Sequence, residues 1–367
     1  MTIKVCHVTS MHRVFDTRIF YKECASLSKK YEVYLVASNV ESQIKNGIHI
    51  VGVPMPPHGI RKMLTTKPVI KAAEEIDADV YHFHDPELIR AGLKLKKKGK
   101  KVIFDYHENF KEFLLTKDLL PKTFRTIASF LWGMVEKKAL SKYHAVISVT
   151  PFIVDRLKEY NSRTYQITNY PFKENIADNR EWGKSICFVG GIVPQWMHHN
   201  IIKSLDKTNA IYRLAGAYAP ESYYEELKCI PSWEKVDYKG MIDYKEIFPF
   251  LQKSSAGMLI RTYKDPNSGY TKGSLGCNKL FEYMMAGIPL ISSNMEEWAK
   301  IIEKYKCGIV VDPDDIESIT RAVNYVVNNP EEAKRMGDNG KKAAMEYYHW
   351  GTQEVLLYGI YDYVLNL

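Results

Sequence analysis

Short apolar runs alternate with helical segments in two separate series along this chain, and the alternation strongly constrains the fold. In the first series the apolar runs are residues 3–8, 31–37, 48–53, 78–83, 101–104 and 145–149, with helical patterns over 15–29, 69–76, 88–97 and 124–140. In the second series the runs are residues 185–189, 211–215, 236–238, 256–260, 290–293 and 308–311, with late helices over 316–327 and 330–347. Nearly continuous apolar strands between helices are typical of a parallel sheet covered on both faces. The sequence therefore predicts an α/β protein with two doubly wound, Rossmann-like parallel-sheet domains.

A segment rich in Asn, Arg, Pro and Gly separates the two series at residues 160–184 and reads as an interdomain connection. The chain has 367 residues, a length that suits two domains of ordinary size. We expect domains over residues 1–170 and 171–347. A last helix lies in residues 348–367, after the break at Trp350-Gly351.

The basic residues are concentrated in the first half of the chain. Residues 1–170 hold 28 Lys and Arg against 17 Asp and Glu, a net charge of +11, whereas the rest carries −3 of the total +8. These residues do not fall in a recognisable nucleic-acid-binding motif, so we expect no nucleic-acid partner. An anionic membrane surface or an acidic acceptor is the simpler partner for this half.

Six cysteines are scattered along the chain with no C-x-x-C pair, which favours reduced thiols over a disulfide framework or a zinc site. The N-terminus reads as a strand and not as a signal peptide, and no apolar run reaches the ~20 residues of a transmembrane helix. We therefore expect a cytoplasmic protein, with peripheral contact at the inner face of the cell membrane left open.

Residues 278–289, NKLFEYMMAGIP, read as a short helix with its start and stop signals. Asn278 is placed to cap the helix, and Gly287 followed by Pro289 is placed to end it. The preceding loop holds three glycines, and such a loop entering a helix N-terminus is a common phosphate cradle. Glu282, one turn inside, is placed to accept hydrogen bonds from a ribose diol. A plain surface helix with a solvated Glu282 is an equally weighted alternative.

Polar side chains follow the predicted strands of the first half, where ligands of parallel α/β sheets bind. They are Asp16 and Arg18, then His84 and Asp85, then His107 and Glu108. Asp16 and Arg18 either pair within their loop or line a pocket. His82 and His84 face the same side of one strand, but no third ligand lies nearby in sequence, so the sequence predicts no metal site.

These segments together resemble the GT-B glycosyltransferases of family 4, also called group 1. Residues 278–289 resemble that family's donor-site pattern P-x-K-x-x-E-Y-M-x-x-G-x-P. Asp16-Thr17-Arg18 resembles the D-x-R of its first loop, and residues 81–87 and 104–108 resemble its two histidine-bearing strand ends. Phe188-Val189-Gly190-Gly191 resembles the first strand and turn of its donor domain. The resemblance spans nearly the whole chain and implies a GT-B fold whose C-terminal helix crosses back to the N-terminal domain.

The resemblance implies an enzyme that moves a sugar from a UDP- or GDP-sugar to a hydroxyl with retention of configuration, in polysaccharide or lipid-linked glycan synthesis. The acceptor would be a glycan or a lipid-linked molecule on the side of residues 1–170, with the nucleotide bound by residues 171–347. No metal or other cofactor is expected, since protein groups of the family take the diphosphate charge.

Carried over by position, the resemblance assigns Glu282 to the ribose and the N–H groups near Asn278 and Lys279 to the diphosphate. Gly190 and Gly191 would allow close approach to the same phosphates. His107 matches the family histidine near the reacting centre, where it would orient donor and acceptor oxygens. On the acceptor side, the matching positions are Asp16, Arg18, His84, Asp85 and Glu108.

The sequence departs from the family pattern at two positions. Ser274 stands where the first of two glutamates eight residues apart is usual, so it becomes the candidate for donor-sugar contact. Gly191 stands where an Arg is usual, and Arg261, at the end of a predicted strand, is our first candidate for the missing diphosphate charge.

Two other functions remain open. A nucleotide-sugar epimerase of similar fold would need a pair of acid/base carboxylates, which the sequence does not assign. A non-catalytic nucleotide-sugar-binding subunit would be consistent with Ser274 and Gly191. A dinucleotide dehydrogenase is not supported, because no G-x-G-x-x-G follows the first strand.

Overall fold

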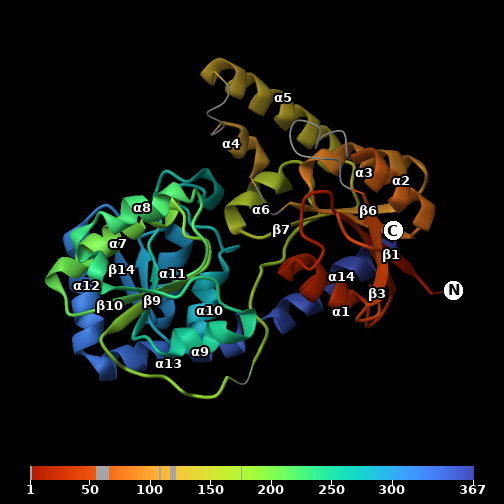
Figure 1. Ribbon diagram of the computed structural model, residues 1–367. Coiled ribbons are helices and arrows are strands. Elements are labelled where there is room, and N and C mark those ends of the chain that lie inside the picture. The colour runs from red at the N-terminus through yellow and green to blue at the C-terminus, as the bar shows by residue number, and fades with distance from the viewer. Residues whose placement is uncertain (1, 55–65, 107–108, 116–120, 175) are drawn as a thin grey trace. The chain divides into compact units, whose positions relative to one another are not determined.

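Two sheets organise the chain, each in its own unit (Figure 1). The computed structural model describes residues 2–54, 66–106, 109–115, 121–174 and 176–367. Unit 1 comprises Met1–Asn169 and Gly351–Leu367, and unit 2 comprises Tyr170–Trp350. The change of unit after Asn169 lies one residue from the boundary expected at 170.

The sheet of unit 1 has the strand order β3-β4-β2-β1-β5-β6-β7-β8. Its strands are β1 Lys4–Val8, β2 Glu32–Ser38, β3 Gln43–Lys45, β4 Ile48–Val53, β5 Val80–Phe83, β6 Lys101–Tyr106, β7 Ala145–Ser148 and β8 Thr164–Gln166. All neighbours are parallel except β3, which pairs antiparallel with β4 at the edge. β8 lies within the segment that the sequence indicated as connection, because three residues are too few for an apolar pattern. The chain runs from β1 first to β2 and later to β5 on the other side, so the strand order reverses beside β1.

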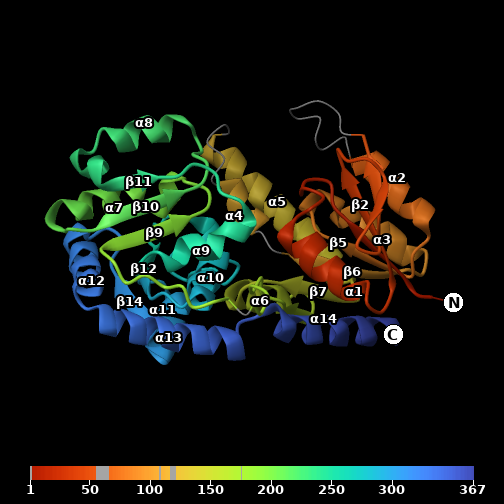
Figure 2. The same cartoon turned by 60° about the horizontal axis from the view of Figure 1, so that its bottom comes forward.

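The helices of unit 1 cover both faces of its sheet in Figure 2. They include α2 Thr66–Ile76, α3 Ile89–Lys97, α4 Phe110–Leu115, α5 Lys122–Leu140 and α6 Pro151–Lys158. The helix expected over residues 15–29 is a π-helical turn, η1 Thr17–Cys24, followed by α1 Ala25–Leu27. Asp16 starts η1, since its Oδ1 accepts the N–H groups of Arg18 at 2.8 Å and Ile19 at 3.0 Å. π-Turns of this kind are frequent at functional sites.

The C-terminal helix α14, Trp350–Leu365, belongs to unit 1, as the predicted GT-B architecture requires (Figure 2). Tyr358 Oη donates to the carbonyl of Ser26 in α1 at 2.8 Å. Tyr361 is fully buried, and its Oη lies 2.8 Å from His82 Nδ1 in β5. Gln353 Oε1 accepts the N–H of Thr168 at 2.8 Å. The last helix thus contacts segments from three parts of the unit.

The sheet of unit 2 is wholly parallel and has the order β11-β10-β9-β12-β13-β14. Its strands are β9 Ser185–Val189, β10 Ile211–Ala215, β11 Val236–Tyr238, β12 Ala256–Leu259, β13 Leu290–Ser293 and β14 Gly308–Val311. Here the strand order reverses beside β9, which lies between β10 and β12. The helices are α7 His198–Ser204, α8 Ser222–Lys228, α9 Ile247–Gln252, α10 Asn278–Ala286, α11 Glu296–Tyr305, α12 Ile316–Asn328 and α13 Pro330–Glu346.

Helix α10 is the helix predicted at NKLFEYMMAGIP, with one correction at its start. Cys277 is the N-cap, without a side-chain cap bond, and Asn278 is the first helical residue, so the prediction of an Asn278 cap is wrong. Gly287 ends the helix as predicted, in the left-handed conformation at φ 76°. Leu280, Phe281 and the run Tyr283–Ala286 are buried. The helix therefore belongs to the core of unit 2, with its N-terminal turn half-buried.

None of the helices within the described ranges combines the length and apolar character that crossing a bilayer requires.

Two helical glycines give a test of how closely α13 packs on α10. A Cβ at Gly337 in α13 would overlap the carbonyl oxygen of Gly287, whereas a Cβ at Gly359 in α14 would meet open space. We expect Gly337→Ala to destabilise unit 2 by about 1–3 kcal/mol through overpacking. Gly359→Ala should stabilise unit 1 by about 0.5–1 kcal/mol, because alanine loses less entropy in a helix. Urea unfolding of both variants measures the two changes, and equal effects would contradict the packing described.

Candidate functional site

Two backbone segments approach each other closely after β9, at the edge where the strand order of unit 2 reverses. Gly190 has φ 136°, and its N–H donates to the carbonyl of Ala215 at 3.0 Å. Gly216 has φ 138°, and a Cβ there would overlap the carbonyl oxygen of Gly190. Both positions need glycine, since L side chains rarely adopt this conformation. Gly190 therefore adds no side chain of its own at the carboxyl end of β9.

Lys279, in the first turn of α10, extends to this turn. A Cβ at Gly190 would lie 2.7 Å from Lys279 Nζ, so the ammonium group rests directly against the glycine backbone. The same Nζ lies 4.7 Å from the ring centroid of Trp196 and 5.0 Å from that of Phe188. Cation–π contacts of this kind hold the ammonium in place. The structure thus brings Gly190 and Lys279 together, as the resemblance to family 4 implied.

Arg261 follows β12 and lies against the same indole. Its guanidinium carbon is 4.4 Å from the ring centroid of Trp196. Its Nε donates to Asp265 Oδ2 at 2.5 Å, and a second nitrogen pairs with the same oxygen. Two cations therefore share one tryptophan, and one of them is partly neutralised by Asp265. Trp196, only 6% exposed, was not among the predicted site residues, because its role depends on contacts distant in sequence.

The other predicted residues of unit 2 lie around this cluster. Asn278 and Glu282 are half-buried in the first turns of α10, and Gly191 is exposed beside Gly190. Ser274 is held within its loop: its carbonyl accepts the indole N–H of Trp298 at 3.0 Å and its Oγ accepts the N–H of Gly276 at 3.1 Å. The first N–H groups of a helix have no partner within it and form the positive end of its dipole. Lys279, Arg261 and the start of α10 together suit an anionic group such as a phosphate.

In unit 1, Asp85 organises the carboxyl ends of β1 and β5. Its Oδ2 accepts the hydroxyl of Thr9 at 2.7 Å and the N–H of Ser10 at 2.6 Å, and its Oδ1 lies 2.8 Å from His12 Nδ1. Burial alone would raise the pKa of Asp85, but the hydrogen bonds from His12, Thr9 and Ser10 lower it to about 2. Asp85 is 1% exposed, and its buried hydrogen bonds hold the loop after β1 in place.

Arg18 lies inside unit 1, where its side chain pairs with Asp105. Its Nε donates to Asp105 Oδ2 at 2.6 Å, a second nitrogen donates to Asp105 Oδ1 at 2.9 Å, and a third donates to the carbonyl of Ile167. Asp16 instead binds backbone N–H groups of η1. With 5% of its surface exposed, Arg18 joins η1, β6 and the segment after β8.

His84 is also buried, at 2% exposure, and its Nε2 lies 2.9 Å from Nδ1 of His7 in β1. The structure therefore places His84, Asp85 and Arg18 beneath the carboxyl edge of this sheet and leaves Asp16 half-buried at its loop. His107 and Glu108, the remaining predicted residues of this half, lie outside the described residues.

Two family profiles match consecutive parts of the chain. The profile described as "Glycosyltransferase Family 4" matches residues 18–169, and the one described as "Glycosyl transferases group 1" matches residues 168–343. The chain belongs to glycosyltransferase family 4. The profiles meet at the change of unit after Asn169, so each covers most of one unit.

Solved structures of GT-B glycosyltransferases share the fold over nearly the whole length of the family 4 chain. Sucrose-phosphate synthase from Thermosynechococcus elongatus is similar with a TM-score of 0.76 and 14% identity over 99% of both chains. HepE from Anabaena, in complex with UDP and glucose, has a TM-score of 0.71 and 12% identity, covering 98% of this chain and 99% of HepE. WaaG, a glycosyltransferase involved in lipopolysaccharide biosynthesis, has a TM-score of 0.70 and 11% identity, with coverage of 98% and 99%. The predicted GT-B architecture is thus confirmed.

Among curated proteins, a mannosyltransferase is similar to a short stretch of this chain. The MMP alpha-(1->4)-mannosyltransferase of Mycolicibacterium hassiacum is 26% identical over 82 residues, which are 22% of this chain and 20% of that protein. The match spans only about a fifth of the relative's length and supports glycosyl transfer in general terms.

The pKa of Asp85 predicts a pH-dependent contribution to stability. A carboxyl whose pKa is lowered on folding stabilises the protein above its unfolded pKa, and this contribution is lost as the pH falls through the folded pKa of about 2. We expect Asp85→Asn to cost about 2 kcal/mol at pH 7 and roughly half of that at pH 3. Urea unfolding of both proteins across this range gives the difference. A cost that stays constant with pH would contradict the ionised, hydrogen-bonded Asp85.

Proposed function

We propose that this chain transfers a glycosyl group from a nucleoside-diphosphate sugar to a hydroxyl acceptor, with retention of the anomeric configuration. The proposal rests on the placement of Lys279 and Arg261 against the indole of Trp196, next to the Gly190 turn. This arrangement offers two cations and a helix N-terminus to one anionic group at the reversal of strand order.

In this proposal the donor diphosphate lies between Gly190 and the first turn of α10. Lys279 neutralises the negative charge that develops on the leaving diphosphate. Arg261 adds a second positive charge, which its ion pair with Asp265 partly neutralises. These groups supply the positive charge without a metal ion at the diphosphate. Glu282, three residues beyond Lys279 and half-buried, accepts the ribose hydroxyls. HepE, of similar fold, was crystallised with UDP and glucose, which supports a UDP-sugar as the first donor to try.

The chemical step breaks the bond from the anomeric carbon to the diphosphate oxygen and forms a bond from the same carbon to the acceptor oxygen. The acceptor proton passes to the leaving diphosphate, so no protein side chain has to take it. We propose that His107 orients the reacting oxygens and that Ser274 contributes to sugar selection. The acceptor is a glycan or a lipid-linked glycan, a class consistent with the role of WaaG in lipopolysaccharide biosynthesis.

Nucleotide binding tests the donor site directly. Lys279→Ala and Glu282→Ala should each weaken binding of the cognate nucleoside diphosphate about 10–100-fold, the effect of losing a hydrogen bond to a charged group. Isothermal titration with UDP and GDP measures this, and release of nucleotide from UDP- and GDP-sugars measures turnover. Lys300→Ala is the matched control, because Lys300 is an exposed lysine paired with Glu296 and Glu297 on α11.

The outcomes separate the functions considered. Nucleotide release with a glycosylated acceptor supports transfer, whereas an isomerised sugar nucleotide without acceptor would indicate an epimerase. Binding without either product would indicate a non-catalytic subunit. Unchanged affinity in both Lys279→Ala and Glu282→Ala would overturn the donor-site assignment.

We further propose that unit 1 contacts an anionic membrane surface at the inner face of the cell membrane through α5, which Figure 1 shows at the edge of this unit. Five apolar side chains of α5 are more than half exposed: Phe124, Ile127, Phe130, Leu131 and Met134. Their spacing places them on one face of the helix, within about 120°. Lysines lie in its first and last turns, at Lys122, Lys137 and Lys138. An apolar face with basic ends, in the half of the chain that carries +11, fits the surface of an anionic bilayer.

Vesicle binding tests this surface separately from the donor site. Phe124→Ser with Phe130→Ser should reduce co-sedimentation with phosphatidylglycerol vesicles about 10-fold or more, since each buried Phe contributes ~1.5–3 kcal/mol. High salt should weaken binding of the unaltered protein through screening. Tyr325→Ser, which removes an exposed aromatic side chain of α12, is the control and should leave binding unchanged. Equal binding to neutral and anionic vesicles would contradict the proposed surface.

A further inference from the structure

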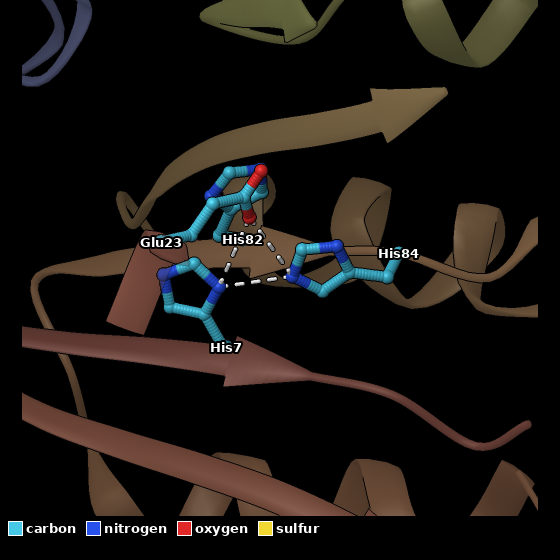
Figure 3. Close-up of side chains that lie close together, drawn as sticks. All are labelled: His7, Glu23, His82 and His84. Atoms are coloured by element: carbon cyan, nitrogen blue, oxygen red, sulfur yellow. Dashed lines mark hydrogen bonds and ion pairs between the residues drawn. The ribbon is translucent and has the colours of Figure 1, made fainter. Parts of the chain in front are cut away.

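Four buried side chains with metal-ligating atoms meet in the centre of unit 1 (Figure 3). They are His7 from β1, Glu23 from η1, and His82 and His84 from β5 and the residue after it. One ligand atom of each lies within 4.8 Å of the others, and all four residues have at most 2% of their surface exposed. Figure 3 shows the Glu23 carboxylate and nitrogens of His7 and His84 converging on one point.

Three of these atoms have the separations of atoms bound to one small cation. His7 Nδ1 lies 2.9 Å from His84 Nε2, and Glu23 Oε2 lies 3.9 Å from the first and 3.8 Å from the second. A point equidistant from three atoms so placed lies about 2.1 Å from each, which is the length of Zn–N and Zn–O bonds. If the two rings moved apart by a few tenths of an ångström, the distance from His7 Nδ1 to His84 Nε2 would reach that between two ligands of a tetrahedral zinc.

His82 supplies a fourth donor. Its ring centroid lies 4.6 Å from that of His7 and 4.8 Å from that of His84. Its Nδ1 is 2.8 Å from Tyr361 Oη, and its Nε2 has no hydrogen-bond partner among the described residues. A buried imidazole nitrogen without a partner is costly, and a bound cation would satisfy it.

The buried carboxylate of Glu23 also lacks hydrogen-bond partners among the described residues, and a buried charge is costlier than a neutral imidazole. Neither of its oxygens receives a hydrogen bond within the described part of the chain. Arg18 Nε lies 3.1 Å from Oε1, but its proton is directed to Asp105 at 2.6 Å. Burial raises the pKa of Glu23 well above its usual value, although Arg18 opposes this shift. A fully buried carboxylate needs either a proton or a further cation.

The second ring nitrogens and the second carboxylate oxygen each face a group of the kind that orients metal ligands. Tyr361 Oη lies 3.3 Å from His7 Nε2 and 2.8 Å from His82 Nδ1, so it can accept from both rings. His84 Nδ1 lies 3.4 Å from Asp105 Oδ2, which forms a carboxylate–histidine pair. Glu23 Oε1 faces Arg18. Such outer contacts select the ring tautomers that point their lone pairs at a metal.

We propose that His7, Glu23, His82 and His84 form a structural zinc site that joins β1, β5 and η1, with Tyr361 of α14 as its outer support. Three imidazoles and one carboxylate suit Zn²⁺, whereas Mg²⁺ and Ca²⁺ prefer oxygen ligands. All ligand positions are taken by protein and the site is buried, which is typical of a structural and not a catalytic zinc. This site is independent of the proposed sugar transfer, and its ligands lie outside unit 2. The sequence did not indicate it, because His7 and Glu23 are distant from His82 in the chain.

Metal analysis of the full chain, after removal of any histidine tag, tests the proposal. We expect close to one Zn²⁺ per chain by mass spectrometry, as a four-ligand site requires. Cobalt substitution should give the visible spectrum of a tetrahedral site, and zinc X-ray absorption should show nitrogen and oxygen neighbours only. Sulfur neighbours would overturn the assignment in favour of the buried Cys6 and Cys24.

Variants locate the metal. Glu23→Gln and His82→Asn should lose the zinc, and Tyr361→Phe, which keeps the ring, should weaken zinc affinity about 10–100-fold. His144→Asn is the matched control: His144 precedes β7 and accepts the N–H of Val102 at 2.9 Å, so the variant removes a hydrogen-bonded histidine of unit 1 that lies outside the cluster. No zinc and no cobalt spectrum in the unaltered chain would refute the site, as would full zinc content in Glu23→Gln and His82→Asn.

Discussion

The interaction on which unit 1 depends is the pair between Arg18 and Asp105, fully enclosed at the carboxyl end of its sheet. Arg18 uses three nitrogens on Asp105 and on the carbonyl of Ile167, so one side chain joins η1 to β6 and to the segment after β8. A buried pair contributes little net stability compared with apolar packing, but removing one partner costs about 3–5 kcal/mol. The pair joins η1, which follows the loop that carries Asp16, to β6.

The same pair determines the state of its neighbours. Asp105 accepts the hydrogen bond of Arg18 Nε, so Glu23 receives no hydrogen bond from that nitrogen. Asp105 also lies 3.4 Å from His84 Nδ1 and so orients the ring of His84. The Glu23 carboxylate in the interior of unit 1 is therefore short of hydrogen-bond donors within the described ranges. A bound cation at Glu23 would remove that shortage, and a proton would remove only part of it, since His82 Nε2 would stay unsatisfied.

Much of this architecture could be predicted from the sequence, because its determinants are local. Strand–helix alternation predicts both sheets, and the left-handed Gly287 confirms the helix end read from its glycine. The determinants that escaped prediction are contacts across long stretches of sequence. Trp196 becomes part of the site only because Lys279 and Arg261 reach it, and His7 joins His84 only because β1 and β5 pair. Asn278 failed as a cap because the loop at Cys277 enters the helix one residue earlier.

Arg18 in unit 1 and Lys279 in unit 2 are held in opposite ways. Arg18 faces two carboxylates, so its charge is cancelled where it lies. Lys279 rests on the rings of Trp196 and Phe188, which attract a cation through their quadrupoles but carry no net charge. A cation held in this way keeps its positive potential for an incoming anion while its position is fixed beforehand. Arg261 is intermediate, with Asp265 on one side and the indole on the other. Neutralisation by neighbouring carboxylates therefore decreases from Arg18 through Arg261 to Lys279, and this order is the physical basis for the diphosphate position proposed at the Gly190 turn.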